Sequence, residues 1–146
     1  MKRKHFEIAI NAGKEKVWDV LWNKDTYPVW TSVFCEGSSA VTDWNEGSKV
    51  LFISSKGEGM YSTIEKKTIP EFMSFKHIGM VKDGKELPVD AETEKWSGAK
   101  ENYTLSSRGN NTLLEVDMDI TEDHESYFDD NFPKGLSKVK ELAEGD

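Results

Sequence analysis

The sequence predicts an α+β domain in which a curved antiparallel sheet wraps a long C-terminal helix. Three observations predict it: apolar and polar residues alternate near the N-terminus, strand-like segments with short breaks fill the middle, and the C-terminal segment has helical spacing. Such a sheet has one face that needs cover. The C-terminal helix, about 30 Å long at about 1.5 Å per residue, is the element long enough to cover it.

The N-terminal part predicts one strand and two short helices. Residues 4–10 alternate between apolar and polar side chains, which indicates a strand with one buried face. Residues 14–22 have helical spacing with apolar residues on two faces, so this helix either packs on both sides or lines a cavity with one of them. A second helix is expected between Asp25 and Phe34, since Pro28 is tolerated in a first turn.

The middle of the chain predicts six further strands, which gives a sheet of seven. The breaks between most of them are short and rich in glycine and asparagine, which indicates hairpins and therefore antiparallel pairing. Residues 82–97 differ, because this polar connection is too long for a tight hairpin, and loops of that length often carry function. The six strands are expected at residues 38–44, 48–55, 59–68, 71–79, 101–107 and 112–120.

The C-terminal segment, residues 123–143, predicts the long helix. Its apolar residues recur three and four positions apart from Phe128 to Ala143. Pro133 and Gly135 disturb this pattern, so we expect the helix to start or kink near Pro133.

Short motifs in a characteristic order span the chain: Ile10-Asn11-Ala12, Val17-Trp18-Asp19-Val20-Leu21, Trp30, Gly47, Ile69-Pro70-Glu71, Glu101-Asn102-Tyr103-Thr104-Leu105 and Phe132-Pro133-Lys134-Gly135-Leu136. With the order of elements, they resemble the START-like superfamily, also called SRPBCC or Bet v-type, which has the helix-grip fold. Within it the chain looks like the branch named after activators of the heat-shock-protein-90 ATPase. The resemblance implies a helix-grip fold with a cavity, and no particular reaction, because the branch has no shared catalytic set.

Length and composition predict a single soluble domain over residues 1–146 that can bury a substantial core. The net charge of −8 argues against nucleic-acid binding, because such proteins usually present a basic face. No segment approaches the ~20 apolar residues of a membrane span, and no apolar run follows the basic N-terminus as in a signal peptide. The single cysteine, Cys35, fits a reducing compartment, so we expect a cytoplasmic protein.

Acidic residues gather between Arg108 and Lys134, where the sequence has no lysine or arginine. A solvated strand face and helix start is the simpler interpretation, and a docking surface for a basic protein partner is the alternative. The residues of this acidic stretch are Glu115, Asp117, Asp119, Glu122, Asp123, Glu125, Asp129 and Asp130.

The sequence offers no catalytic or metal-binding motif. His5, His77 and His124 lie far apart, without the spacing of histidine metal sites. Cys35 has no neighbouring histidine to activate it, and we expect a buried, inert thiol. We therefore assign no catalytic residue, no metal ligand and no cofactor, and favour a binding role over an enzyme.

The aromatic residues are the most informative group, since they exceed what a minimal core of this size needs. Most must pack in the core, but in a helix-grip arrangement some line the cavity, and apolar pockets with few polar groups are typical of small-molecule sites. We expect His77 and Tyr103 to make the orienting polar contacts. The cavity candidates are Trp22, Trp30, Phe34, Phe52, Met60, Phe75, His77, Trp96, Tyr103, Phe128 and Phe132.

Three functions follow as hypotheses. The first is a binding module for a small hydrophobic or amphipathic ligand. The second is a protein-interaction module of the heat-shock ATPase activator type that uses the acidic stretch, and the third is a cavity enzyme such as a cyclase or hydrolase. Whether the cavity is open or filled by side chains depends on the tertiary structure.

Overall fold

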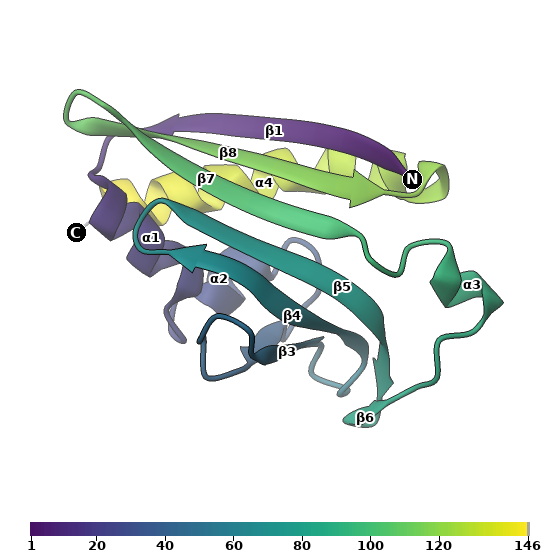
Figure 1. The fold of residues 1–146 in the computed structure, drawn as a ribbon. Coiled ribbons are helices and arrows are strands. Elements are labelled where there is room, and N and C mark those ends of the chain that lie inside the picture. The colour runs from purple at the N-terminus through teal and green to yellow at the C-terminus, as the bar shows by residue number, and fades with distance from the viewer. Residues whose placement is uncertain (146) are drawn as a thin grey trace.

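A computed structural model describes residues 1–145 and contains an eight-stranded antiparallel sheet with the main helices gathered on one side (Figure 1). The strands lie in the order β1-β8-β7-β5-β4-β3-β2, and β6 pairs with β5 outside this path. The predicted α+β architecture is thereby confirmed. The elements in chain order are β1 (Lys2–Ile10), α1 (Lys14–Trp22), α2 (Tyr27–Thr31), β2 (Ser39–Val41), β3 (Lys49–Ile53), β4 (Gly59–Thr68), β5 (Phe72–Lys82), β6 (Lys85–Glu86), α3 (Ala91–Glu94), β7 (Lys100–Arg108), β8 (Asn111–Ile120), the 3-10 turn η1 (Glu122–His124) and α4 (Glu125–Glu144).

The alternation in β8 decides which face of the sheet is covered. Leu114, Val116, Met118 and Ile120 are buried, whereas the acidic residues between them point to the opposite face. Helix α4 packs against β1, α1 and α2, and in Figure 1 it runs along the sheet behind β1, β8 and β7. The hydrophobic core therefore lies between the sheet and α1, α2 and α4.

Helix α4 runs without interruption through Pro133, so the expectation that the helix starts there is wrong. Its buried face, which includes Phe132, Leu136 and Val139, outweighs the backbone hydrogen bond that proline cannot donate. Gly135 has a packing role in the same turn. A Cβ atom at Gly135 would lie 3.2 Å from the ring of Phe34, so the glycine lets α4 approach the segment after α2 closely.

The sheet has one strand more than the seven expected, because β6 forms within the segment expected to be a connection. Asp83 and Gly84 adopt positive φ angles of 52° and 75° and make a two-residue turn between β5 and β6. Asp-Gly is a typical signal for such a hairpin. The strand escaped prediction because its two residues are polar and exposed and show no alternation.

A bulge changes the face that β5 presents to the interior. Tyr61 pairs with Gly79 but Ser62 pairs with His77, so Ile78 is the extra residue. As a result His77, which is buried, and Met80, which is 40% exposed, both line the same cavity although they are three positions apart. Without the bulge they would point to opposite faces.

Among residues 1–145, no helix is both long and apolar enough to cross a membrane.

Candidate functional site

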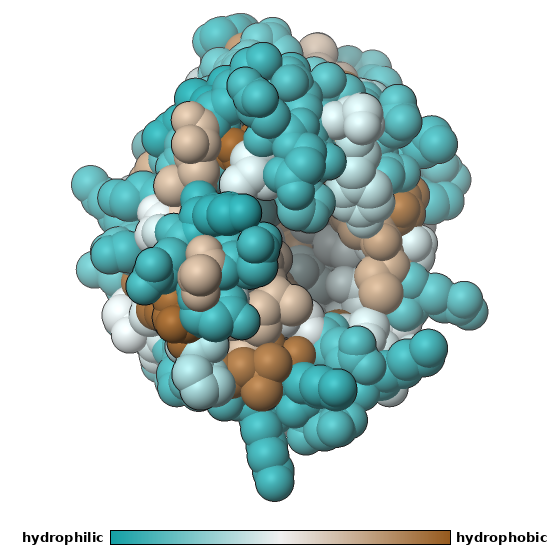
Figure 2. Space-filling model, turned by 90° about the vertical axis from the view of Figure 1, so that its right-hand side faces the viewer, coloured by the Kyte–Doolittle hydropathy of each residue, from teal (hydrophilic) through white to brown (hydrophobic). Residues whose placement is uncertain are grey.

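An open cavity of about 380 Å³ lies between the sheet, α2 and the first turns of α4. Its volume is within the range of about 300–1,000 Å³ that is usual for small-molecule sites. Figure 2 looks at the end of the molecule that carries α3 and the start of α4, and it shows a hollow in this face with apolar atoms beside it. The interior is therefore not completely filled by side chains.

The structure places nine of the eleven cavity candidates on the cavity wall. These nine are Trp30, Phe34, Phe52, Met60, His77, Trp96, Tyr103, Phe128 and Phe132. They come from α2 and the segment after it, from β3, β4, β5 and β7, from the segment after α3, and from α4. That they hold a ligand stays a prediction.

The other two candidates, Trp22 and Phe75, do not line the cavity. Their ring centroids are 5.4 Å apart, and the Trp22 ring also lies 5.0 Å from that of Tyr103. They form part of the packed core behind the cavity wall. The sequence could not separate them from the wall residues, because strand and helix periodicity identifies a buried side chain but not what lies opposite it.

Glu101 is the polar wall residue that sequence reasoning missed. It lies on β7 two positions before Tyr103 and four before Leu105, so all three share one face of the strand. Tyr103 and Leu105 are both buried. A glutamate in phase with buried residues was therefore the available signal.

Four side chains form a hydrogen-bonded chain across β4, β5 and β7. Ser62 Oγ lies 2.6 Å from His77 Nδ1, and His77 Nε2 lies 3.0 Å from Glu101 Oε1. The Tyr103 hydroxyl donates to the other oxygen of Glu101. Because an ionised carboxylate only accepts hydrogen bonds, His77 Nε2 is the donor to Glu101.

This chain differs from the serine–histidine–carboxylate arrangement of hydrolases, whose serine oxygen faces the substrate. Ser62 is 0% exposed and does not line the cavity, whereas His77 and Glu101 do. Ser62 is therefore placed to hold the imidazole ring of His77 and not to attack a ligand.

Two buried tyrosines stay protonated beside this chain. Burial raises the pKa of Tyr27 and of Tyr103 well above the usual value near 10, and the negative charge of Glu101 raises both further. Both phenols therefore remain neutral at physiological pH.

Cys35 corrects a further expectation, because its side chain is exposed and lines the cavity. Helix α2 ends at Thr31, and the chain then turns, with the amide of Cys35 donating to the carbonyl of Thr31 at 3.3 Å. The apolar stripe of the helix does not extend to Cys35. The thiol therefore lies outside the core.

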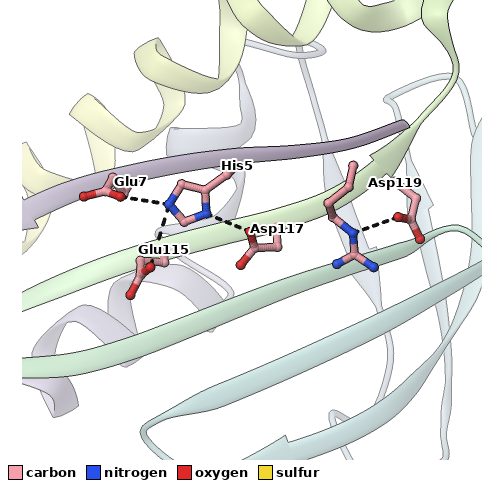
Figure 3. A network of polar contacts seen from close by, with 6 residues as sticks. His5, Glu7, Glu115, Asp117 and Asp119 are labelled. Atoms are coloured by element: carbon pink, nitrogen blue, oxygen red, sulfur yellow. Dashed lines mark hydrogen bonds and ion pairs between the residues drawn. The ribbon is translucent and has the colours of Figure 1, made fainter. Parts of the chain in front are cut away.

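The members of the acidic stretch that belong to β8, Glu115, Asp117 and Asp119, lie beside the basic start of β1 on the outer face of the sheet (Figure 3). Arg3 Nε is 2.9 Å from a carboxylate oxygen of Asp119, and His5 Nδ1 is 2.7 Å from one of Asp117. Lys4 Nζ lies 3.0 Å from Glu125. Part of the acidic charge is thus neutralised within the chain.

One group on this outer face could in principle hold a metal ion. Ligand atoms of His5, Glu7 and Glu115 all lie within 4.8 Å of one another. All three side chains are open to solvent, and exposed clusters of this kind are common without an ion. We assign no metal to it.

A sheet that wraps a C-terminal helix around an internal cavity defines the class: the chain has a helix-grip fold. The sequence matches no family model and no curated protein. Among solved structures it is similar to the Aha1 dimer from Colwellia psychrerythraea, with 20% identity and a TM-score of 0.76 over 99% of this chain and 97% of that one.

Two further solved structures are similar. The AHSA1-like protein from Aeromonas hydrophila has 14% identity and a TM-score of 0.70 over 98% of this chain and 92% of that one. CalU16 from Micromonospora echinospora has 16% identity and a TM-score of 0.66 over 97% and 76%. The predicted resemblance is thereby confirmed at the level of the fold, which Aha1-like proteins share.

Proposed function

We propose that this protein is a binding module for a small hydrophobic or amphipathic molecule held in the cavity. The observation that carries the proposal is an open space of about 380 Å³ with a wall that is rich in aromatic side chains. Protein interiors are close-packed and contain few voids larger than a water molecule, so core packing does not account for a space of this size. We further propose that residues 1–146 act as one domain and that the protein works in the cytoplasm.

The chemistry of the wall suits an amphipathic ligand. Trp30, Phe52 and Phe132 offer apolar surface, while Glu101 and His77 supply a few polar groups in one part of the wall. Sites of this composition bind through apolar contact and orient the ligand through the polar groups.

A fluorescent apolar dye tests the proposal. N-phenyl-1-naphthylamine, which is uncharged, should bind at one saturable site and be displaced by decan-1-ol. Ala99→Leu should weaken this binding, because Ala99 is buried and lines the cavity, and the leucine would place three more carbon atoms in the ligand's space. Ala9→Leu is the matched control, because Ala9 is exposed on β1.

Circular dichroism should show that both variants fold. Either of two results would contradict the proposal. The first is that the unaltered protein shows no saturable binding of the dye. The second is that Ala99→Leu binds the dye as tightly as Ala9→Leu does.

A protein-interaction role is the second candidate, favoured by the Aha1-like neighbours and by the acidic stretch. The ion pairs of Lys2, Arg3 and Lys4 weaken it, although Glu122 and Asp130 have no ion-pair partner within residues 1–145. Pull-down at low and high salt tests this role, because salt screens contacts between exposed charges. No partner captured at low salt would count against it.

A cavity enzyme is the third candidate, favoured only by the hydrogen-bonded chain from Ser62 to Tyr103. The variant His77→Ala tests this role, because it should remove the turnover of any substrate to which His77 transfers a proton. Unchanged turnover in this variant would exclude that role.

A further inference from the structure

We infer that the cavity selects amphipathic molecules with a positively charged or hydrogen-bond-donating head group, such as an alkylamine, and rejects those with an anionic head group. The inference rests on the proposed binding function and names the ligand class of the same cavity. It follows from the side chains of the wall, of which Glu101 carries the decisive charge.

Glu101 keeps hydrogen-bonding capacity for a ligand. A carboxylate has about four lone-pair sites, and the two bonds from His77 and Tyr103 occupy one site on each oxygen. Its side chain is 19% exposed and lines the cavity, so a head group can reach the remaining sites. A charge in such a partly buried position acts more strongly than one in water.

The hydrogen-bond donors next to Glu101 are already bonded to other groups of the protein. The Nδ1 atom of His77 is bonded to Ser62 and its Nε2 atom to Glu101, so the ring offers no free N–H whether it is neutral or charged. The hydroxyl of Tyr103 donates to Glu101. This part of the wall therefore presents acceptors to a ligand.

Other donors on the wall are also used by the protein itself. The indole of Trp30 donates to the carbonyl of Leu21 at 3.0 Å. The hydroxyl of Thr31 donates to its own helix, to the carbonyl of Tyr27, and the hydroxyl of Tyr127 donates to the carbonyl of Phe34.

No lysine or arginine within residues 1–145 lines the cavity, and the second histidine on its wall, His124, is 58% exposed and lies 3.5 Å from Asp123. Asp119 also touches the cavity, but Arg3 pairs with it on the outer face of the sheet. A carboxylate or phosphate placed beside Glu101 would be buried next to a like charge without a cation, which is costly.

Three probes with the same decyl chain test the inference: decan-1-amine, decan-1-ol and decanoate. Each is titrated against the bound dye at pH 7. Because hydrogen bonds to charged groups are among the strong ones, we expect the amine to bind at least about tenfold more tightly than decanoate, with the alcohol between them.

Two matched variants locate the selectivity. Glu101→Gln keeps the shape of the side chain and removes its charge, so the advantage of the amine over the alcohol should disappear. Asp130→Asn removes one charge from an exposed helix position and should leave the advantage intact. This control separates the cavity charge from the net charge of −8.

The results separate two kinds of failure. If neither the dye nor any probe binds, the proposed function itself is wrong. If the probes bind but decanoate binds as tightly as the alcohol, or if Glu101→Gln keeps the full advantage of the amine, the binding function stands and the inference on ligand class is overturned. The order of affinities in the unaltered protein decides the question even if Glu101→Gln does not fold.

Discussion

The hydrogen bond between Ser62 and His77 gives a stability prediction with an internal control. Its two atoms are 2.6 Å apart, and the two side chains are 0% and 7% exposed. Ser62→Ala deletes one oxygen and leaves the Nδ1 atom of His77 buried without a partner, which costs about 1–3 kcal/mol. At about 4 °C per kcal/mol for a chain of this size, the unfolding midpoint should fall by about 4–12 °C.

Ser106→Ala is the matched control because the Ser106 hydroxyl is buried and has no hydrogen-bond partner among the described residues. Removing it breaks no bond and relieves the burial of an unpaired polar group, so stability should stay the same or rise slightly. Urea unfolding followed by tryptophan fluorescence and a thermal melt measure both variants.

A double-mutant cycle isolates the bond itself. In a His77→Phe background, Ser62→Ala should cost much less than in the unaltered protein, since the partner is already gone. Equal losses of stability for Ser62→Ala and Ser106→Ala, or no coupling in the cycle, would refute the idea that Ser62 holds the imidazole ring.

Three further predictions test other parts of the structure. The hydrogen bond to Asp117, and to a lesser extent the one to Glu7, raises the pKa of His5. The contribution of His5 to stability should therefore be full below about pH 6.5 and fade as the pH rises through the raised pKa. A difference in urea midpoint between the unaltered protein and His5→Gln that grows with pH would contradict this. Cys35 at the cavity wall should react more slowly with a thiol reagent when decan-1-ol is bound, and an unchanged rate at saturation would argue against binding beside it. Gly59→Ala should destabilise by about 2 kcal/mol or more, because its Cβ atom would lie 1.8 Å from the carbonyl oxygen of Phe52, and urea unfolding should show no comparable loss for a Gly13→Ala control.

Much of the fold was predictable because it follows from local patterns. The alternation in residues 112–120 and the helical spacing in residues 14–22 identified elements that the structure confirms with ends shifted by at most one residue. The β6 strand was missed because a two-residue strand has no period. The C-terminal helix was predicted, but a start at Pro133 was wrong because tertiary packing overrides the helix-breaking tendency of proline.

The candidate site was predictable only as a group of residue types. Nine of the eleven candidates lie on the cavity wall, but no sequence pattern indicated that Trp22 and Phe75 would be packed behind it. It also named His77 and Tyr103 without the carboxylate that joins them, because Glu101 lies 24 positions from His77 in the chain.

The sequence by itself determined which face of each long element is apolar, and hence that a sheet would be covered by a C-terminal helix. Only the tertiary structure decided what that covered space contains. The bulge at Ile78 places both His77 and Met80 on the cavity wall, and strand pairing brings Glu101 to His77 and the basic start of β1 to the acidic residues of β8. Local periodicity records whether a side chain is buried, whereas register and long-range pairing choose its neighbours.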